Sequence, residues 1–127
     1  MNSDDEDQQT LREALTAERD RTAARIAGLE RTFESVVESS ALAPPDDEHD
    51  PEGSTVGFER GQITKLLESD RTHLADLDRA IERLHAGVYG ICADCGQAIA
   101  MERLVALPAA RRCADCAHGA QSPLRRR

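Results

Sequence analysis

Four cysteines, arranged in two pairs, constrain this chain more than any other feature of its sequence. Each pair has the spacing Cys-x-x-Cys, and the pairs are Cys92 with Cys95 and Cys113 with Cys116. A spacer of 17 residues separates them, which lies within the range typical of zinc sites built from two such pairs. Four thiolates complete the tetrahedral coordination of Zn²⁺. The sequence therefore predicts one structural zinc ion bound by all four cysteines.

A zinc ion held by four thiolates has no open coordination position, so it stabilises a fold and does not catalyse. Gly96 directly follows the first pair and suits the tight turn of a zinc knuckle. A redox-active dithiol is the alternative, but two matched pairs without an alternating strand–helix pattern argue against it. The sequence also lacks a nucleophile–base arrangement and a glycine-rich phosphate loop. We therefore expect no catalytic residues and no enzymatic activity of the chain.

The composition favours long helices over a large globular core. Hydrophobic residues make up 39% of the 127 residues but aromatic residues only 2%, whereas charged residues reach 31%. A chain with so few large apolar side chains buries them best along narrow seams between solvated helices.

The first helix is expected from residue 10 to about residue 40. Thr10 and Glu13 have the spacing of a capping box, which marks a helix start. Apolar residues then recur at three- and four-residue steps, with a polar break at residues 18–22. These seam residues are Leu11, Leu15, Ile26, Leu29, Phe33 and Val36. Pro44 and Pro45 are expected to end the helix, because proline lacks the amide hydrogen.

The second helix has the more regular seam. Ser54 or Thr55 is expected to cap its start, and Gly87 lies where a C-terminal cap is expected. The seam residues, with Asp70 as the one polar member, are Ile63, Leu67, Asp70, Leu74, Leu77, Ile81, Leu84 and Val88. Two helices with one apolar stripe each and a short connection predict an antiparallel coiled-coil hairpin. A helical pair that only dimerises is the alternative.

We therefore predict a mainly α protein, in which an antiparallel coiled-coil hairpin is followed by a small four-cysteine zinc finger with a short C-terminal helix. The predicted parts are a disordered acidic tail (residues 1–9), the hairpin (10–87) with an acidic tip (44–54), the zinc finger (88–120) and a basic tail (121–127). Because metal binding and folding are coupled in small zinc modules, zinc is expected to hold the finger against the base of the hairpin.

The zinc-finger sequence contains a series of short motifs. They are GVYGICADCG at residues 87–96, then Ile99, Arg103-Leu104 and Ala106-Leu107-Pro108, and CADC at residues 113–116. This series resembles the DksA/TraR family of transcription regulators. The resemblance implies a protein that binds bacterial RNA polymerase directly and inserts a coiled coil into the secondary channel. It also implies that acidic residues at the tip approach the polymerase active site and modulate initiation.

The tip acids implied by the resemblance are Asp47, Asp50 and Glu52. Known members carry Asp-x-x-Asp-x-Ala at the tip. Counted back from the finger without gaps, these positions fall on His49, Glu52 and Ser54. A shifted register gives Asp47 and Asp50 with Glu52 in place of the alanine, so the tip chemistry differs in either case. Members that respond to the alarmone ppGpp use basic side chains near the junction of helix and finger. The corresponding positions here are Asp76, Leu107 and Ala117, none of which is basic.

The charge of the chain limits its other partners. A formal net charge of -8 repels nucleic-acid phosphates, so we expect no direct sequence-specific DNA binding. A DNA-binding zinc finger using Arg103, Arg111 and Arg112 is nevertheless one alternative, and a structural helical adaptor is another. The sequence shows no secretory signal and no membrane-spanning run, so we expect a cytoplasmic protein. We also expect it to be a monomer.

Overall fold

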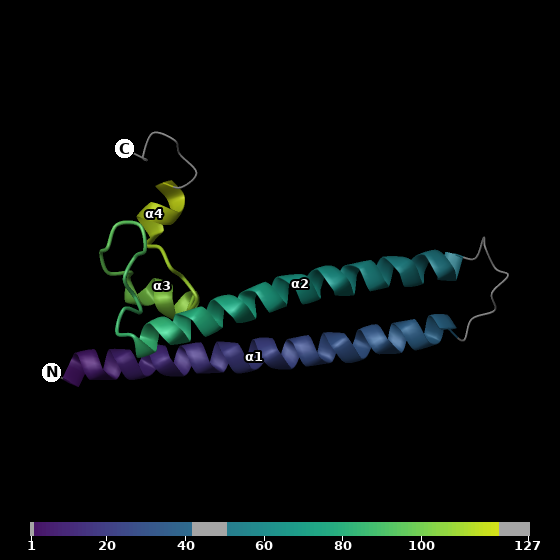
Figure 1. Ribbon diagram of the computed structural model, residues 1–127, viewed down its shortest axis with the longest axis horizontal. Helices are drawn as coiled ribbons and strands as arrows, with labels where there is room; N and C mark the ends of the chain where they lie inside the picture. Colours follow the sequence, from purple (N-terminus) through teal and green to yellow (C-terminus); the bar gives the residue numbers. More distant parts are fainter. Residues whose placement is uncertain (1, 42–50, 120–127) are drawn as a thin grey trace. The chain divides into compact units, whose positions relative to one another are not determined.

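The computed structural model describes the backbone of residues 2–41 and 51–119, and the side chains of residues 5–39 and 55–119 (Figure 1). The elements follow one another as α1 (Asn2–Ala41), α2 (Pro51–His85), α3 (Met101–Ala106) and α4 (Ala114–Gly119). An isolated antiparallel bridge joins Ile91 to Ala98. The mainly α fold, with a short helix at the end of the finger, is confirmed. Within the described part of the chain, no helix is both long enough and apolar enough to cross a membrane.

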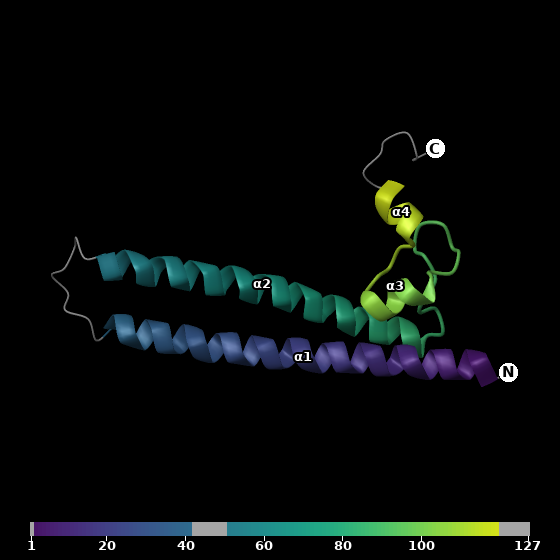
Figure 2. The same cartoon turned by 180° about the vertical axis from the view of Figure 1, so that it is seen from behind.

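The chain divides into two units, one made of residues 1–20 and 75–127 and the other of residues 21–74. Both long helices contribute to both units. Within each unit, α1 and α2 lie side by side and run in opposite directions, as the two views from opposite sides show (Figures 1 and 2). The predicted antiparallel pairing of two long helices is therefore confirmed in each unit.

In the unit of residues 21–74, the seam of the helix pair contains polar residues, two of which form hydrogen bonds with each other across it. Asp70 accepts two hydrogen bonds from Arg25, one from Nε to Oδ2 at 3.0 Å and one from Nη2 to Oδ1 at 3.1 Å. Such a two-point contact satisfies both carboxylate oxygens at once. Thr22, from the polar break of α1, is fully buried. The polar members therefore belong to the packed interface of this unit.

In the other unit, the finger and the adjoining helix segments share one apolar core. Its buried members are Leu11, Leu15, Leu77, Ala80, Tyr89, Cys92, Ile99 and Leu104. The first four come from α1 and α2, and the last four from the finger. The prediction that the finger packs against the base of the helix pair is therefore confirmed.

The N-terminus differs from the sequence-based prediction, because α1 begins at Asn2 and residues 2–9 are helical, not a disordered tail. Carboxylates in the first turns of a helix are stabilised by the positive end of its dipole, and this segment is rich in them. Thr10 is not a capping residue either. Its hydroxyl donates to the carbonyl oxygen of Glu6 at 2.9 Å, a bond made inside a helix.

The start of α2 also differs, since the helix begins at Pro51 and not after Ser54 or Thr55. Proline is well suited to the first helical position, where its missing amide hydrogen has no acceptor in the helix. Residues 42–50, which include the two prolines expected to end α1, lie outside the described residues, as does the predicted basic tail at 121–127.

Gly87 ends α2 as predicted. It has a φ of +79°, in the left-handed region that glycine adopts without a Cβ clash. The amide of Gly87 donates to the carbonyl of Leu84 at 3.2 Å, and the amide of Val88 donates to that of Arg83 at 2.9 Å. This pair of bonds forms a Schellman motif, which satisfies the last helical carbonyls and turns the chain towards the first cysteine pair.

The shared core predicts where a truncation destabilises the protein. We expect Leu77→Ala to lower the free energy of unfolding by about 2–5 kcal/mol, because Leu77 is fully buried and its loss leaves a cavity. Leu66→Ala is the control, since Leu66 is 53% exposed and its truncation should change the free energy by about 0.5 kcal/mol or less. Urea unfolding followed by circular dichroism measures both. Equal effects of the two substitutions would contradict this account of the core.

Candidate metal centre

The sulfur atoms of the four cysteines form one cluster. They belong to Cys92, Cys95, Cys113 and Cys116 and lie within 4.8 Å of one another. The Sγ atoms of Cys95 and Cys113 are 3.8 Å apart. With zinc–sulfur bonds of about 2.3 Å, the edges of a tetrahedron of thiolates around Zn²⁺ are also about 3.8 Å long. The cluster therefore has the donor set and the size that a single structural zinc ion requires.

The first pair is held in a tight turn. The amide of Cys92 donates to the carbonyl of Gln97 at 2.8 Å, and the amide of Gly96 donates to the carbonyl of Cys92 at 2.9 Å. Gly96 has a φ of +74°, so a residue with a side chain would be strained there. The role predicted for Gly96 is confirmed, because the turn places Cys92 and Cys95 on the same side of the knuckle.

The second pair lies at the start of α4. The amide of Cys116 donates to Sγ of Cys113 at 3.4 Å, and the amide of Ala117 donates to the carbonyl of Cys113 at 2.9 Å. The helical turn therefore brings the two sulfurs together and directs an amide dipole at one of them. An amide donor stabilises the charged thiolate that metal binding needs.

The thiols of the cluster differ in acidity. Backbone amides, first that of Cys113 and then that of Cys95, lower the pKa of the Cys92 thiol to about 6. In contrast, hydrogen bonds with the sulfurs of Cys113 and Cys92 raise the pKa of the Cys116 thiol. One sulfur is therefore readily ionised while another resists ionisation beside its neighbours. A divalent cation removes this conflict, because it stabilises all four thiolates together.

Hydrogen bonds outside the cluster connect its two halves. The amide of Ala93 donates to the carbonyl of Arg111 at 2.8 Å. Nε of Arg103, on α3, donates to the carbonyl of Arg112 at 2.9 Å, and Arg112 pairs with Asp94 at 3.6 Å. These contacts hold the segment before the second pair against the turn of the first pair.

A buried tyrosine adds a further connection that the sequence analysis did not assign. Tyr89 is 7% exposed, and its hydroxyl donates to the carbonyl of Pro108 at 2.8 Å. The bond fixes the chain between α3 and the second cysteine pair. Tyr89 and Pro108 both belong to the motif that carries the family resemblance, but nothing in their spacing indicates that they meet.

The predicted tip acids are not described at the level of side chains. Asp47 and Asp50 lie outside the described residues, and Glu52 lies in the first turn of α2 without a described side chain. The acidic tip therefore stays a prediction.

Comparison with known proteins identifies the zinc-binding segment. The prokaryotic dksA/traR C4-type zinc finger family matches residues 87–121. General stress protein 16O of Bacillus subtilis is 33% identical over 87 residues, which are 68% of this chain and 53% of that protein. An uncharacterized protein of Aquifex aeolicus is 48% identical over 44 residues, which are 35% of this chain and 30% of that protein. The matches thus span about half of the first relative and less than a third of the second.

The fold is also similar to a solved structure. Transcription factor DksA2 from Pseudomonas aeruginosa matches with a TM-score of 0.80 and 27% sequence identity, over 96% of this chain and 88% of that chain. The paired helices and the four-sulfur cluster define a helical protein with a C4 zinc finger. The chain belongs to the DksA/TraR family and holds one structural zinc ion.

Removal of zinc should unfold the finger, because the ion and its ligands fold as one event. We expect about one zinc ion per chain in the intact protein by atomic emission. We expect chelation or Cys113→Ser to abolish the slow amide hydrogen exchange of residues 88–119. Ala114→Ser is the matched control, since it places the same hydroxyl on the neighbouring exposed residue. Unchanged protection of the finger after complete zinc removal would show that the ion is not structural.

Proposed function

We propose that this chain regulates transcription by binding bacterial RNA polymerase in its secondary channel, where an acidic tip modulates initiation. The supporting observation is the similarity to transcription factor DksA2, which extends over 96% of this chain and includes both the helix pair and the finger. The resemblance of the zinc-finger motif to polymerase-binding regulators supports the same partner.

The segment between α1 and α2 has the chemistry that this role requires. It contributes Asp46, Asp47, Glu48 and Asp50, and Glu52 follows in the first turn of α2. Carboxylates are the preferred protein ligands of Mg²⁺, on which the polymerase active site depends. The function therefore lies in regulating the catalysis of a partner enzyme, and the chain itself is proposed to be no enzyme.

The alternative of a DNA-binding finger finds less support in the described contacts. Of its three candidate arginines, Arg103 donates to a backbone carbonyl and Arg112 pairs with Asp94. Two of the three cations are thus engaged within the finger, and the net charge of -8 repels a DNA duplex.

Neutralising the tip tests the proposal. The variant Asp47→Asn, Asp50→Asn, Glu52→Gln should bind RNA polymerase with an affinity within about twofold of the wild type, because the substitutions leave the finger and both long helices unchanged apart from these three exchanges of similar size. It should no longer alter initiation. Pull-down of RNA polymerase with the zinc-loaded protein, and transcription in vitro with the same samples, measure the two properties.

The matched control for the tip variant is Asp20→Asn, Glu82→Gln, Glu102→Gln, which removes three exposed carboxylates from other described positions. This control should keep the full effect on initiation. If the wild type does not bind polymerase, the proposed function is wrong. If the tip variant still alters initiation like the wild type, the acids have no regulatory role.

We expect the junction of helix and finger to bind ppGpp weakly or not at all, so this protein and ppGpp should cooperate little there. The three positions are Asp76, which pairs with Arg79 at 2.9 Å, Leu107, which is 52% exposed, and Ala117. None supplies a cation for a phosphate. We expect transcription assays to show at most a weak joint effect of this protein and ppGpp. A strong joint effect of protein and ppGpp would refute this expectation.

A further inference from the structure

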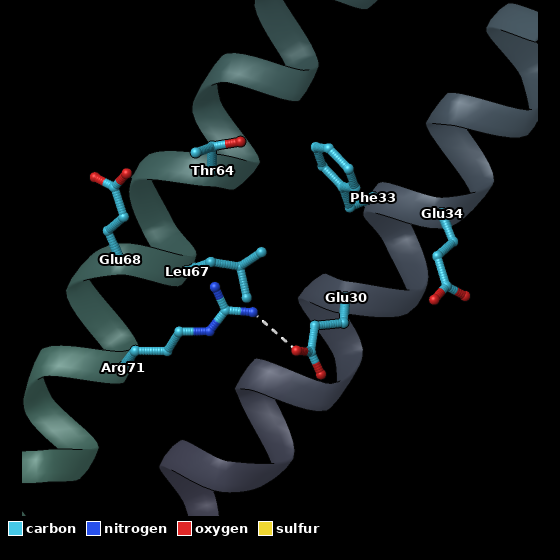
Figure 3. A pocket seen from close by; sticks show the side chains of 7 residues that line it. All are labelled: Glu30, Phe33, Glu34, Thr64, Leu67, Glu68 and Arg71. Atoms are coloured by element: carbon cyan, nitrogen blue, oxygen red, sulfur yellow. Dashed lines mark hydrogen bonds and ion pairs between the residues drawn. The ribbon is translucent and has the colours of Figure 1, made fainter.

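The paired segments of α1 and α2 in the unit of residues 21–74 enclose an open groove of about 480 Å³. Seven residues line it, namely Glu30, Phe33 and Glu34 from α1 and Thr64, Leu67, Glu68 and Arg71 from α2. The volume is sufficient for one or two large side chains of a partner. Figure 3 shows that Phe33, Thr64 and Leu67 point into the space between the two helices.

The groove exists because the two helices do not complete the burial of their apolar seam here. On α2, Ile63 and Leu67 are 9% and 7% exposed. On α1, the seam residues of this unit, which are Ile26, Leu29, Phe33 and Val36, all remain half-buried. Phe58 and Val37, in the same unit, are 66% and 36% exposed. A third helix laid along the groove would bury apolar surface that the pair leaves in contact with water.

Carboxylates flank the apolar floor. Glu30 is paired with Arg71 at 2.9 Å, and this ion pair crosses the groove (Figure 3). Glu34 and Glu68 lie on the outer sides of α1 and α2 and point away from the groove. Neither forms a hydrogen bond or an ion pair with another residue that the structure describes. The lining therefore has three carboxylates and one guanidinium, with an unpaired negative charge beside each helix.

The acidic row on α1 opposes the stability of the helix. Glu30, Glu34 and Glu38 follow one another at four-residue spacing, and like charges at this spacing repel. Only Glu30 has a described cationic partner, Arg71. A partner that brings cations to both flanks of the groove would relieve this repulsion and satisfy Glu34 and Glu68.

We infer that this groove binds a basic amphipathic helix of a partner protein. Large apolar side chains of that helix fill the space over Phe33 and Leu67, and long flanking Lys or Arg side chains reach over the outer sides of α1 and α2 to pair with Glu34 and Glu68 (Figure 3). An apolar strip received by a groove, with complementary charges on the rim, is a recurring mode of helix recognition. A second copy of this chain and a nucleic acid fit less well, because both are negatively charged.

The test uses a synthetic peptide and does not depend on the proposed function. The probe is a fluorescent Leu/Lys peptide of about 18 residues with leucines along one face, which is long enough to form a helix. The comparison peptide keeps every lysine and replaces each leucine with glutamine. Fluorescence anisotropy with the full-length, zinc-loaded protein should show binding of the Leu/Lys peptide and roughly tenfold weaker binding of the glutamine peptide, because only the first fills the groove.

Variants locate the binding. Glu34→Gln with Glu68→Gln should weaken peptide binding roughly three- to tenfold, because two rim charges are lost. The control with the same change in charge, Asp20→Asn with Glu82→Gln, should leave binding within about twofold. Phe33→Ala removes the aromatic side chain from the floor of the groove and should weaken peptide binding. Circular dichroism checks that this variant folds. Thr64→Lys keeps Phe33 and Leu67 but places a cation inside the groove, so it should also weaken binding of the basic peptide. This variant replaces Phe33→Ala in the test if Phe33→Ala unfolds.

The outcomes separate the groove from general electrostatic attraction. Weaker binding to the Glu34 and Glu68 variant and to Thr64→Lys, with unchanged binding to the control, supports the inference. The inference is overturned if the wild type binds no peptide, or if the glutamine peptide binds as tightly as the leucine peptide. It is also overturned if the Glu34→Gln, Glu68→Gln variant and the Asp20→Asn, Glu82→Gln control bind the leucine peptide equally well. Because no polymerase is present, these outcomes are independent of the pull-down that tests the proposed function.

Discussion

The coordination of one ion by four sulfurs is the interaction on which the folded base of this protein depends. The finger spans little more than thirty residues and contributes only four buried side chains to the shared core. An apolar core of that size does not offset the entropy of ordering the segment. The bonds to zinc supply the missing stability. The short bonds around the site, such as that from Tyr89 to Pro108, then define one conformation of the chain between the two cysteine pairs.

Polar contacts within the helix seam specify how α1 and α2 align more than they increase the stability of the pair. A seam of leucines alone would tolerate several alignments of α1 and α2. The contact between Arg25 and Asp70 is satisfied in one alignment only, because displacement of either helix by a turn leaves a carboxylate in the seam without its partner. Polar groups at such positions are best known for fixing the register of paired helices. We interpret Asp70, the one interruption of a regular apolar stripe, as a residue that sets register.

The features that the sequence predicts well are those determined by spacing. The three- and four-residue steps of the seam predict both long helices, and the two Cys-x-x-Cys pairs predict the sulfur cluster. Helix boundaries are predicted less well. Thr10 and Glu13 match a capping box, yet the same hydroxyl bonds equally well to the carbonyl of Glu6 inside a longer helix. The pairing of Tyr89 with Pro108 joins residues that are distant in sequence, so it follows only from the folded chain.

Cys92 belongs at once to the metal site and to the core. Its side chain is 2% exposed and belongs to the apolar core that the finger shares with both long helices, whereas Cys95 is exposed. Histidine also binds zinc, and at Cys95 the larger ring would find room in solvent. At Cys92 an imidazole would have to displace close-packed neighbours, even though its chemistry suits the ion. The four ligand positions are therefore unequal. Cys95 is constrained mainly by coordination chemistry, whereas volume also constrains Cys92 and, to a lesser extent, the partly buried Cys113 and Cys116, which pack against the core.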